Sequence, residues 1–341
     1  MTAFAIRIPG SDVQVDGRHD KSVLDSCLAA GVAFPYNCRS GECGECIASI
    51  CAGEVHELPG ADPAVFNDTH RRQGMTLACL AYPRSDITVA VHLRESSGPP
   101  IREFDAVVHE VKRHGPTIVE VVVRTEAPVE YRAAQYFDWV LPGVTPDRSF
   151  SAANRPGSTT LEFHVRIYPG GKVGKLLARH EIAPGDVLTL RGPFGSVGLE
   201  SDDYRPAILV AGGTGLAPIK AVLDAAFAEG CGRPLSFFYG TRRQEDLYHL
   251  DTMAAWTRAH PNFSFLPVLS DEPAASSWTG ERGLVTEALA RNVTDAFGAV
   301  AFMCGPPPMI DAAIPVLRRL GVDRDDIHYD KFTPIAFQAS T

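Results

Sequence analysis

Hydrophobic residues follow two different periods along the chain, one before and one after Arg205. In residues 161–167 every odd position is apolar, and residues 117–124 are rich in β-branched side chains. A period of two is typical of a β-strand with one buried face. Gly and Pro separate these short segments, so we expect residues 102–202 to form an antiparallel β-barrel.

After Arg205 the apolar residues form continuous runs separated by helical segments. Such runs are typical of strands buried on both faces, and their alternation with helices predicts a parallel α/β sheet over residues 203–341. The predicted strands are residues 207–211, 235–239, 263–269 and 299–304, and the predicted helices are residues 218–228, 250–259 and 308–320.

Residues 1–95 have a third pattern, in which strands accompany one short helix and an irregular cysteine-rich loop. Ser22 is a suitable N-cap for a helix over residues 23–30, and Gly31 is suited to end it. Residues 96–101 combine Ser, Gly and Pro without apolar periodicity, which predicts a linker. The chain is therefore expected to be multidomain, with an α+β part, a β-barrel and an α/β part in that order.

Composition narrows the classes of function. The 341 residues suffice for two or three domains, and the net charge of −9 argues against nucleic acid as a partner. No apolar run approaches the roughly 18 residues that span a bilayer, so no membrane partner is expected. Arg7 stands where a secretion signal would need an apolar block. We therefore expect a cytoplasmic protein whose cysteines are metal ligands or free thiols rather than disulfides.

Three of the eight cysteines lie in one tight loop. Cys38, Cys43 and Cys46 have the spacing C-x4-C-x2-C, and 32 residues separate Cys46 from Cys79. This is the ligand spacing of a plant-type [2Fe–2S] cluster. Glycines within the loop allow backbone N–H groups to approach the sulfur atoms of such a cluster. The sequence thus predicts an iron–sulfur site on these four cysteines.

A structural zinc site is the other reading of this loop. Zinc usually takes paired C-x2-C units, and only one such unit exists here. Cys51 competes with Cys79 for the fourth position, but we prefer Cys79 because a distant ligand is needed to close the cage. Cys27, Cys51 and Cys231 are expected to be ordinary buried thiols.

Two further motifs lie in the predicted barrel. The segment Arg148-Ser149-Phe150-Ser151 stands between predicted strands, and Gly170-Gly171-Lys172-Val173-Gly174 leads into a helix that starts near Val173. With the cysteine loop and the α/β part, these motifs resemble the ferredoxin–NADP⁺ reductase superfamily. The resemblance is specifically to reductase components of bacterial aromatic-ring-hydroxylating dioxygenases of the terephthalate, benzoate and anthranilate type.

This resemblance covers essentially the whole chain. It implies a β-grasp [2Fe–2S] ferredoxin domain, an FAD-binding barrel and an NAD(P)-binding domain, in that order. Arg148 would pair with the flavin diphosphate, and Ser151 would hydrogen-bond near flavin N5. Phe150 and Gly174 stand where the family has Tyr and commonly Ser. The implied flavin-binding residues are Arg148, Ser149, Phe150, Ser151, Gly171, Lys172, Val173 and Gly174.

A glycine-rich loop follows the first strand of the predicted parallel sheet. Its glycines permit a tight turn and a close approach to a pyrophosphate. The resemblance implies that this loop binds the nucleotide, that Cys304 lies beside the nicotinamide C4 and that Phe332 covers the flavin. The implied residues are Gly212, Gly213, Thr214, Gly215, Pro218, Cys304, Gly305 and Phe332, and the implied catalytic residues are Ser151, Cys304 and Phe332.

The turn after the second strand of this sheet is expected to meet the adenosine ribose. Arg242 or Arg243 suits a 2′-phosphate, whereas Glu245 or Asp246 suits a free 2′-hydroxyl. NADH and NADPH therefore both remain open as electron donors.

Together these features imply an electron relay. Electrons would pass from NADH or NADPH to FAD, then to the [2Fe–2S] cluster, and from there to the terminal oxygenase component of an aromatic-ring dioxygenase system. The alternatives are the reductase of a di-iron monooxygenase or a deoxysugar dehydrase, a zinc-stabilised interaction module, and an enzyme that reduces a small molecule directly from flavin.

Overall fold

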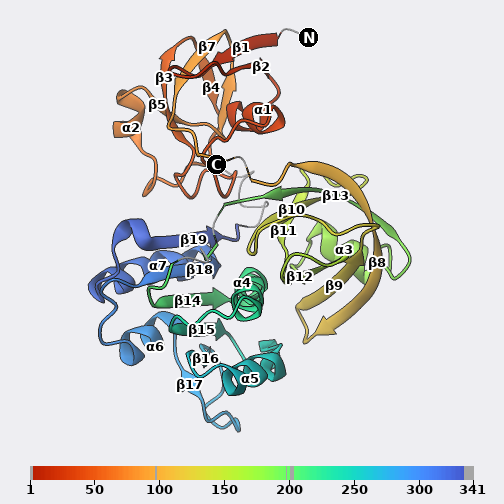
Figure 1. Cartoon of the computed structure of the whole chain (residues 1–341). Coiled ribbons are helices and arrows are strands. Elements are labelled where there is room, and N and C mark those ends of the chain that lie inside the picture. Colours follow the sequence, from red (N-terminus) through yellow and green to blue (C-terminus); the bar gives the residue numbers. More distant parts are fainter. Residues whose placement is uncertain (1–2, 97, 197, 200–202, 334–341) are drawn as a thin grey trace. The chain divides into compact units, whose positions relative to one another are not determined.

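The computed structural model describes residues 3–96, 98–196, 198–199 and 203–333 (Figure 1). The chain divides into two compact units, one built mainly from residues 1–101 and the other mainly from residues 102–332. Ser97 of the predicted linker and the predicted boundary at residue 202 lie outside the described residues. Among the described residues, no helix combines the length and the apolar character needed to cross a membrane.

A five-stranded mixed sheet, in the order β2-β1-β7-β3-β5, forms the first unit. Its strands are β1 (Ala3–Arg7), β2 (Gln14–Arg18), β3 (Ile47–Ala52), β5 (Met75–Leu77) and β7 (Ile87–Ala90), and β4 (Val55–Glu57) pairs with β6 (Ala81–Pro83). Helix α1 (Val23–Ala29) begins as predicted, because the Ser22 hydroxyl oxygen accepts a hydrogen bond from the Asp25 N–H at 3.0 Å. A short helix, α2 (Asp68–Arg72), adds to the predicted elements.

The predicted β-barrel is confirmed in the second unit. Its strands are β8 (Arg102–His114), β9 (Ile118–Arg124), β10 (Tyr136–Val140), β11 (Arg148–Ser151), β12 (Thr160–Arg166) and β13 (Val187–Phe194), in the order β11-β10-β13-β8-β9-β12. A bridge between Ala152 and Phe163 joins the two ends of this order, so the sheet closes on itself. The odd positions of β12 fill the barrel core, as the alternation predicts, and its even positions face outward. Helix α3 (Lys172–Ala178) follows β12.

A six-stranded parallel sheet completes the second unit, in the order β17-β16-β15-β14-β18-β19. Its elements are β14 (Ala207–Gly212), β15 (Leu235–Thr241), β16 (Phe263–Leu269), β17 (Glu281–Arg282), β18 (Val300–Gly305), β19 (Ile327–Lys331), α4 (Leu216–Ala228), α5 (Leu250–Ala259), α6 (Val285–Asn292) and α7 (Pro307–Arg319). Figure 1 shows α4 and α5 on one side of the sheet and α6 and α7 on the other. Leu209 packs beneath the first pair and Val210 beneath the second, which explains the continuous apolar runs.

Two strands of the barrel differ from the sequence expectation. The Arg148–Ser151 motif is itself strand β11 and does not merely connect two strands, because its backbone pairs with residues 136–139 of β10. The sequence pattern does not single out strand β8, because a register shift between Val108 and Glu110 breaks its alternation of apolar and polar positions.

The barrel core provides a direct test of this architecture. Phe163 is fully buried, and its ring stands edge-on to the Trp139 ring with centroids 5.4 Å apart. Replacing Phe163 with Ala leaves a cavity and is expected to lower the free energy of unfolding by about 3–5 kcal/mol. The matched control is Phe297→Ala, because Phe297 is 87% exposed and its loss should change stability by less than about 0.5 kcal/mol. Urea unfolding followed by tryptophan fluorescence measures both changes, and equal midpoints would contradict the assigned core.

Candidate functional site

The structure brings the four predicted cluster cysteines together in the first unit. Cys38, Cys43 and Cys46 lie between α1 and β3, and Cys79 lies between β5 and β6. The Cys38 and Cys43 sulfur atoms are 3.2 Å apart, and the thiols of Cys46 and Cys79 share a hydrogen bond. The Ser40 backbone N–H donates to the Cys38 sulfur at 3.4 Å.

Glycines shape the cysteine loop. Gly41 and Gly44 have φ of 86° and 79°, a backbone region that costs glycine little and other residues much more. A Cβ on Gly41 would lie 2.7 Å from the Leu80 Cδ1, and a Cβ on Gly44 would lie 2.7 Å from the Val65 Cγ1. The loop therefore needs glycine at both positions, and the backbone can turn tightly around the sulfur atoms.

The thiols of this loop behave as a cation-binding set. The hydrogen bond with the Cys43 thiol lowers the pKa of Cys38 to about 5, although burial opposes this shift, and the same contact raises the pKa of Cys43. Metal ions bind cysteines by displacing their thiol protons. Four clustered sulfur atoms with a backbone N–H directed at one of them suit a [2Fe–2S] cluster.

The remaining cysteines lie outside this group of four. Cys27 is buried in α1, and burial raises the pKa of its thiol to about 12. The expectation that Cys51 is buried was wrong, because the last two residues of β3 are exposed. Cys231 is only partly buried.

The predicted flavin motif occupies strand β11, which pairs with β10. The Ser149 hydroxyl donates to Asp138 Oδ1 at 2.7 Å, and Ser151 is buried opposite Tyr136 of β10. The Phe150 ring packs against the barrel core, with its centroid 4.6 Å from that of Trp139. Arg148 is half-buried, and its guanidinium donates to the backbone carbonyl of Pro146.

Helix α3 begins as the sequence predicts. Gly171 is its N-cap and carries no side chain to cover the N–H groups of the first turn, which therefore stay available for an anion. The Lys172 ammonium donates to the Thr145 carbonyl at 3.3 Å, and Val173 is buried. A Cβ on Gly174 would lie 3.0 Å from the Ile167 Cγ2, so the larger residue common in the resembling family would be crowded here.

The nucleotide loop and the Cys304-Gly305 turn meet at the carboxyl ends of β14 and β18. A Cβ on Gly215 would lie 1.9 Å from the Cys304 carbonyl oxygen, and a Cβ on Gly305 would lie 2.9 Å from the Gly212 nitrogen. Gly213 adopts φ of 57°, and Thr214 and Pro218 are buried in the turn and the first part of α4. Close backbone packing at this point explains the run of glycines.

Two residues of this site were missed by sequence reasoning. The Tyr239 hydroxyl donates to the Gly213 carbonyl at 3.1 Å, and a Cβ on Gly213 would lie 2.8 Å from Arg166 Nη1. Arg166 is an even-position residue of β12, so the alternation places it on the outer face of the barrel but does not indicate what it meets there.

Cys304 lies in β18, and Phe332 directly follows β19, the strand that pairs with β18. Burial raises the pKa of the Cys304 thiol well above its usual value, so this thiol stays neutral. The Phe332 backbone N–H donates to the Gly305 carbonyl at 2.8 Å, and the Phe332 ring packs against the α4 side of the sheet.

The turn expected to meet the adenosine ribose carries side chains of both charges. The Arg243 backbone N–H donates to Asp246 Oδ2 at 3.2 Å, and the Arg243 guanidinium lies 3.5 Å from Asp271 Oδ2. Arg242 is exposed beside them. This arrangement leaves the choice between NADH and NADPH open.

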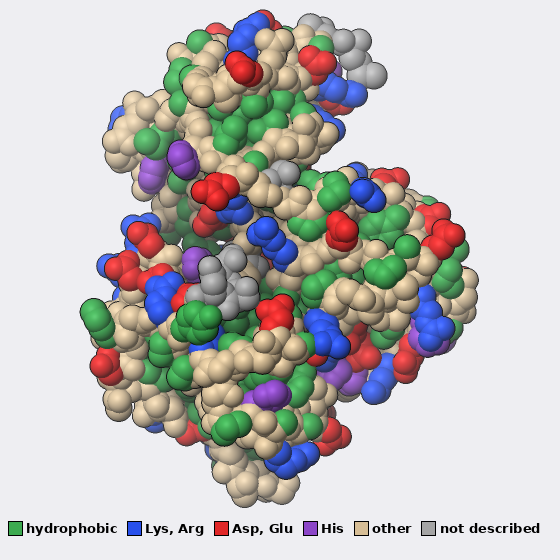
Figure 2. All heavy atoms as spheres, viewed as in Figure 1, with side chains coloured by type: hydrophobic (Ala, Val, Ile, Leu, Met, Phe, Trp, Pro, Cys, Tyr) green, Lys and Arg blue, Asp and Glu red, His purple; other side chains and the backbone are tan. Residues whose placement is uncertain are grey.

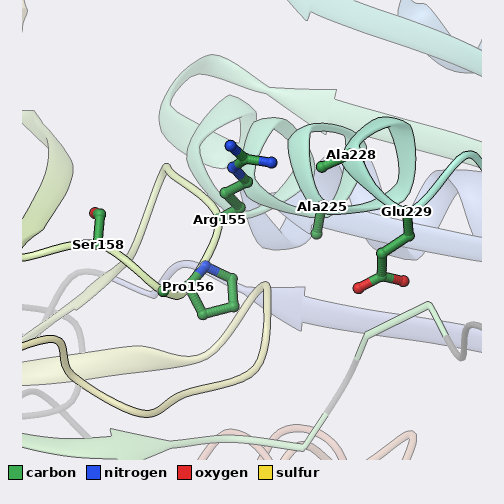
Figure 3. Close-up of a pocket in the computed structure, with 7 residues that line it drawn as sticks. Arg155, Pro156, Ser158, Ala225, Ala228 and Glu229 are labelled. Carbon is green, nitrogen blue, oxygen red and sulfur yellow. The ribbon is translucent and has the colours of Figure 1, made fainter.

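A cavity of about 390 Å³ lies between the 155–158 loop of the barrel and the end of α4 (Figure 3). Arg155 and Glu229 line it. The predicted flavin and nucleotide residues are not among its lining residues, so it is separate from the site described above.

Comparisons with known protein families agree with this three-part organisation. The "2Fe-2S iron-sulfur cluster binding domain" matches residues 6–84, the "Oxidoreductase FAD-binding domain" residues 109–198, and the "Oxidoreductase NAD-binding domain" residues 209–314.

Similar proteins match the chain from end to end. The propane 2-monooxygenase reductase component of Mycolicibacterium goodii is 33% identical, with 96% of each chain covered. The xylene/toluene monooxygenase electron transfer component of Pseudomonas putida is 35% identical, with 96% of this chain and 93% of that protein covered. The crystal structure of Amycolatopsis cytochrome P450 reductase is 33% identical, with a TM-score of 0.86 over 97% of this chain and 99% of that one.

The predicted fold class, the reductase activity and the FAD, [2Fe–2S] and NAD(P)H cofactors are confirmed by these matches. The chain belongs to the NAD(P)H-dependent oxygenase reductases of the ferredoxin–NADP⁺ reductase superfamily that carry an N-terminal [2Fe–2S] ferredoxin domain.

Proposed function

We propose that this reductase supplies electrons to a di-iron monooxygenase. The observation that carries the proposal is the similarity to reductases of propane and xylene/toluene monooxygenases, which covers 96% of this chain in both cases. The dioxygenase assignment implied by the sequence motifs has weaker support, and the monooxygenase alternative takes its place.

Within this proposal the cysteine loop holds the cluster. Cys38, Cys43, Cys46 and Cys79 are the ligands, and the Ser40 backbone N–H stabilises negative charge on the Cys38 sulfur. Glu42 and Glu45 flank Cys43 in the same loop, and Glu45 is exposed beside Arg94 at 3.3 Å. These acidic side chains would favour a partner with a basic docking face. Figure 2 shows that acidic and basic side chains both occur on the face that is drawn.

The barrel and the parallel sheet would hold FAD and nicotinamide. When bound, FAD accepts a hydride and releases its electrons singly, whereas the cluster carries single electrons. Arg148 and the first-turn N–H groups of α3 would bind the flavin diphosphate, and Ser151 would orient the ring. The loop from Gly212 to Gly215 would bind the nucleotide pyrophosphate, with Arg166 beside it.

Two residues would control access to the hydride-transfer position. Reacting atoms must approach to about 3–3.5 Å, so Phe332 must move aside when nicotinamide binds. The neutral Cys304 thiol would border the nicotinamide without placing a negative charge next to the departing hydride.

The relay predicts separate effects on its two halves. In Cys43→Ser, reduction of cytochrome c by NAD(P)H should collapse, because the cluster is damaged, whereas reduction of the flavin should persist. The matched control is Cys51→Ser, which alters an exposed thiol of the same unit and should leave both rates unchanged. Stopped-flow spectroscopy resolves the two steps, and undiminished cytochrome c reduction in Cys43→Ser would overturn the relay.

The nucleotide loop can be tested through its closest backbone contact. In Gly215→Ala the new methyl group collides with the Cys304 carbonyl, so flavin reduction by NAD(P)H should slow about 100-fold, as expected for a displacement of roughly 1 Å. Gly232→Ala is the matched control, because a Cβ there meets no described atom within 4 Å. Photochemical reduction of the flavin should be normal in both variants, and equal rates with NAD(P)H would rule out this loop as the nucleotide site.

The acceptor is tested directly with purified partners. We expect the reductase to support substrate hydroxylation by a di-iron hydroxylase component, with product formed in proportion to NAD(P)H consumed. A Rieske dioxygenase component serves as the comparison. Coupled turnover with the dioxygenase alone would reverse the proposed choice of partner while leaving the reductase activity intact.

A further inference from the structure

Four side chains with metal-binding atoms gather outside the flavin and nucleotide sites. They are Glu120 of β9, Glu162 and His164 of β12, and His249, which precedes α5. One ligand atom from each lies within 4.8 Å of the others. All four belong to the second unit, in which the barrel and the parallel sheet form one compact body.

Strand alternation brings three of these side chains to one surface. Glu120 and His164 are paired directly across the β9–β12 ladder, and Glu162 lies on the same outer face, two residues before His164. The odd-position residues beside them fill the barrel core, so this face is directed away from the core.

His249 completes the group from the other side of the junction. It has φ of 56°, a left-handed backbone conformation that is unfavourable for residues other than glycine. Its Nε2 lies 3.0 Å from Glu120 Oε2 and 3.5 Å from Glu162 Oε1. Although buried, this nitrogen makes no hydrogen bond within the described part of the chain, so its direction suits a ligand other than the neighbouring carboxylates.

Neighbouring polar side chains orient the members of this group, as hydrogen-bonding partners orient the ligands of bound metals. The Tyr248 hydroxyl lies 2.9 Å from His164 Nδ1, so the other ring nitrogen of His164 points at Glu162 Oε1, 2.7 Å away. Lys220 holds the second oxygen of Glu162 at 2.9 Å, and His114 lies 2.8 Å from Glu120 Oε2. Partners of this kind fix the ring orientation and ligand basicity of metal-binding histidines and carboxylates.

The charge of the group also suits a cation. Glu120 and Glu162 contribute two carboxylates to the group. Lys220 balances one of the two carboxylates, which leaves one negative charge for another cation to neutralise.

We propose that Glu120, Glu162, His164 and His249 form a binding site for a zinc ion, which fastens the flavin barrel to the nucleotide-binding sheet. Two imidazoles and two carboxylates are a donor set that Zn²⁺ accepts, and donors about 2 Å from a tetrahedral ion lie roughly 3.3 Å apart. Three of the donor separations are 2.7, 3.0 and 3.5 Å, on either side of this value, and all four donor atoms lie within 4.8 Å of one another. The site would be structural, because protein side chains fill all four positions.

The test measures zinc on the holoenzyme after removal of loosely held metal with a chelator. Equilibrium dialysis against ZnCl₂, followed by elemental analysis, should give about one zinc per chain without loss of cluster iron. His249→Asn removes the imidazole but keeps a residue that tolerates the left-handed conformation, and zinc affinity should fall by at least about 10-fold. The matched control is His180→Asn, because His180 is exposed and has φ of 57°. It should bind zinc normally.

Two further variants keep the test decisive. Glu120→Gln preserves the size of the side chain and should also weaken zinc binding. This variant tests the site if His249→Asn loses its flavin and fails to fold. Tyr248→Phe removes only the hydrogen bond to His164 and should lower zinc affinity about 10-fold while flavin content stays normal.

Three results would overturn the proposal. Zinc retained equally by His249→Asn and Glu120→Gln would assign the metal to the cysteines or to the surface. If the wild-type protein bound no zinc under these conditions, the four side chains would hold only protons and would not form a metal site. Unchanged affinity in Tyr248→Phe, together with full binding in the other variants, would show that these residues do not form a site.

Discussion

The packing of the second unit depends on the outer face of strands β9 and β12. One face of each strand fills the barrel, so the other face must carry whatever meets the nucleotide-binding sheet. Lys220 of α4 is 8% exposed, and its ammonium donates to the Ala153 carbonyl and to Glu162 Oε2. A buried ammonium without these partners would be strongly destabilising, so the ion pair holds the two layers in one register.

The same outer face serves the functional site. Arg166 continues the row of outward residues and reaches Gly213 in the nucleotide loop, while Glu162 and His164 meet His249 at the other part of the junction. A single alternating strand thus contributes to the barrel core, to the predicted pyrophosphate site and to the proposed zinc site. This sharing couples the packing of the barrel to the position of the nucleotide.

Both units also contain loops in which glycines allow close packing. In the cysteine loop, Gly41 and Gly44 leave room for Leu80 and Val65, and in the nucleotide loop Gly215 lies against the Cys304 carbonyl. In both places a side chain would displace the backbone from the group it is expected to surround. The glycines therefore matter for the shape of the loops as much as for their flexibility.

The sequence by itself determined the periods and the motifs, because both depend on near neighbours. Continuous apolar runs marked β14 and its neighbours, alternation marked β12, and the cysteine spacing marked the cluster loop. Locally irregular strands were not predicted individually: β8 contains a register shift, and β11 is four residues long with three polar residues. The exposure of Cys51, the approach of Arg166 to Gly213 and the meeting of His249 with Glu120 were decided only by the tertiary structure. Such contacts depend on how whole faces pack against each other, and no local pattern specifies which distant side chains will share a buried space.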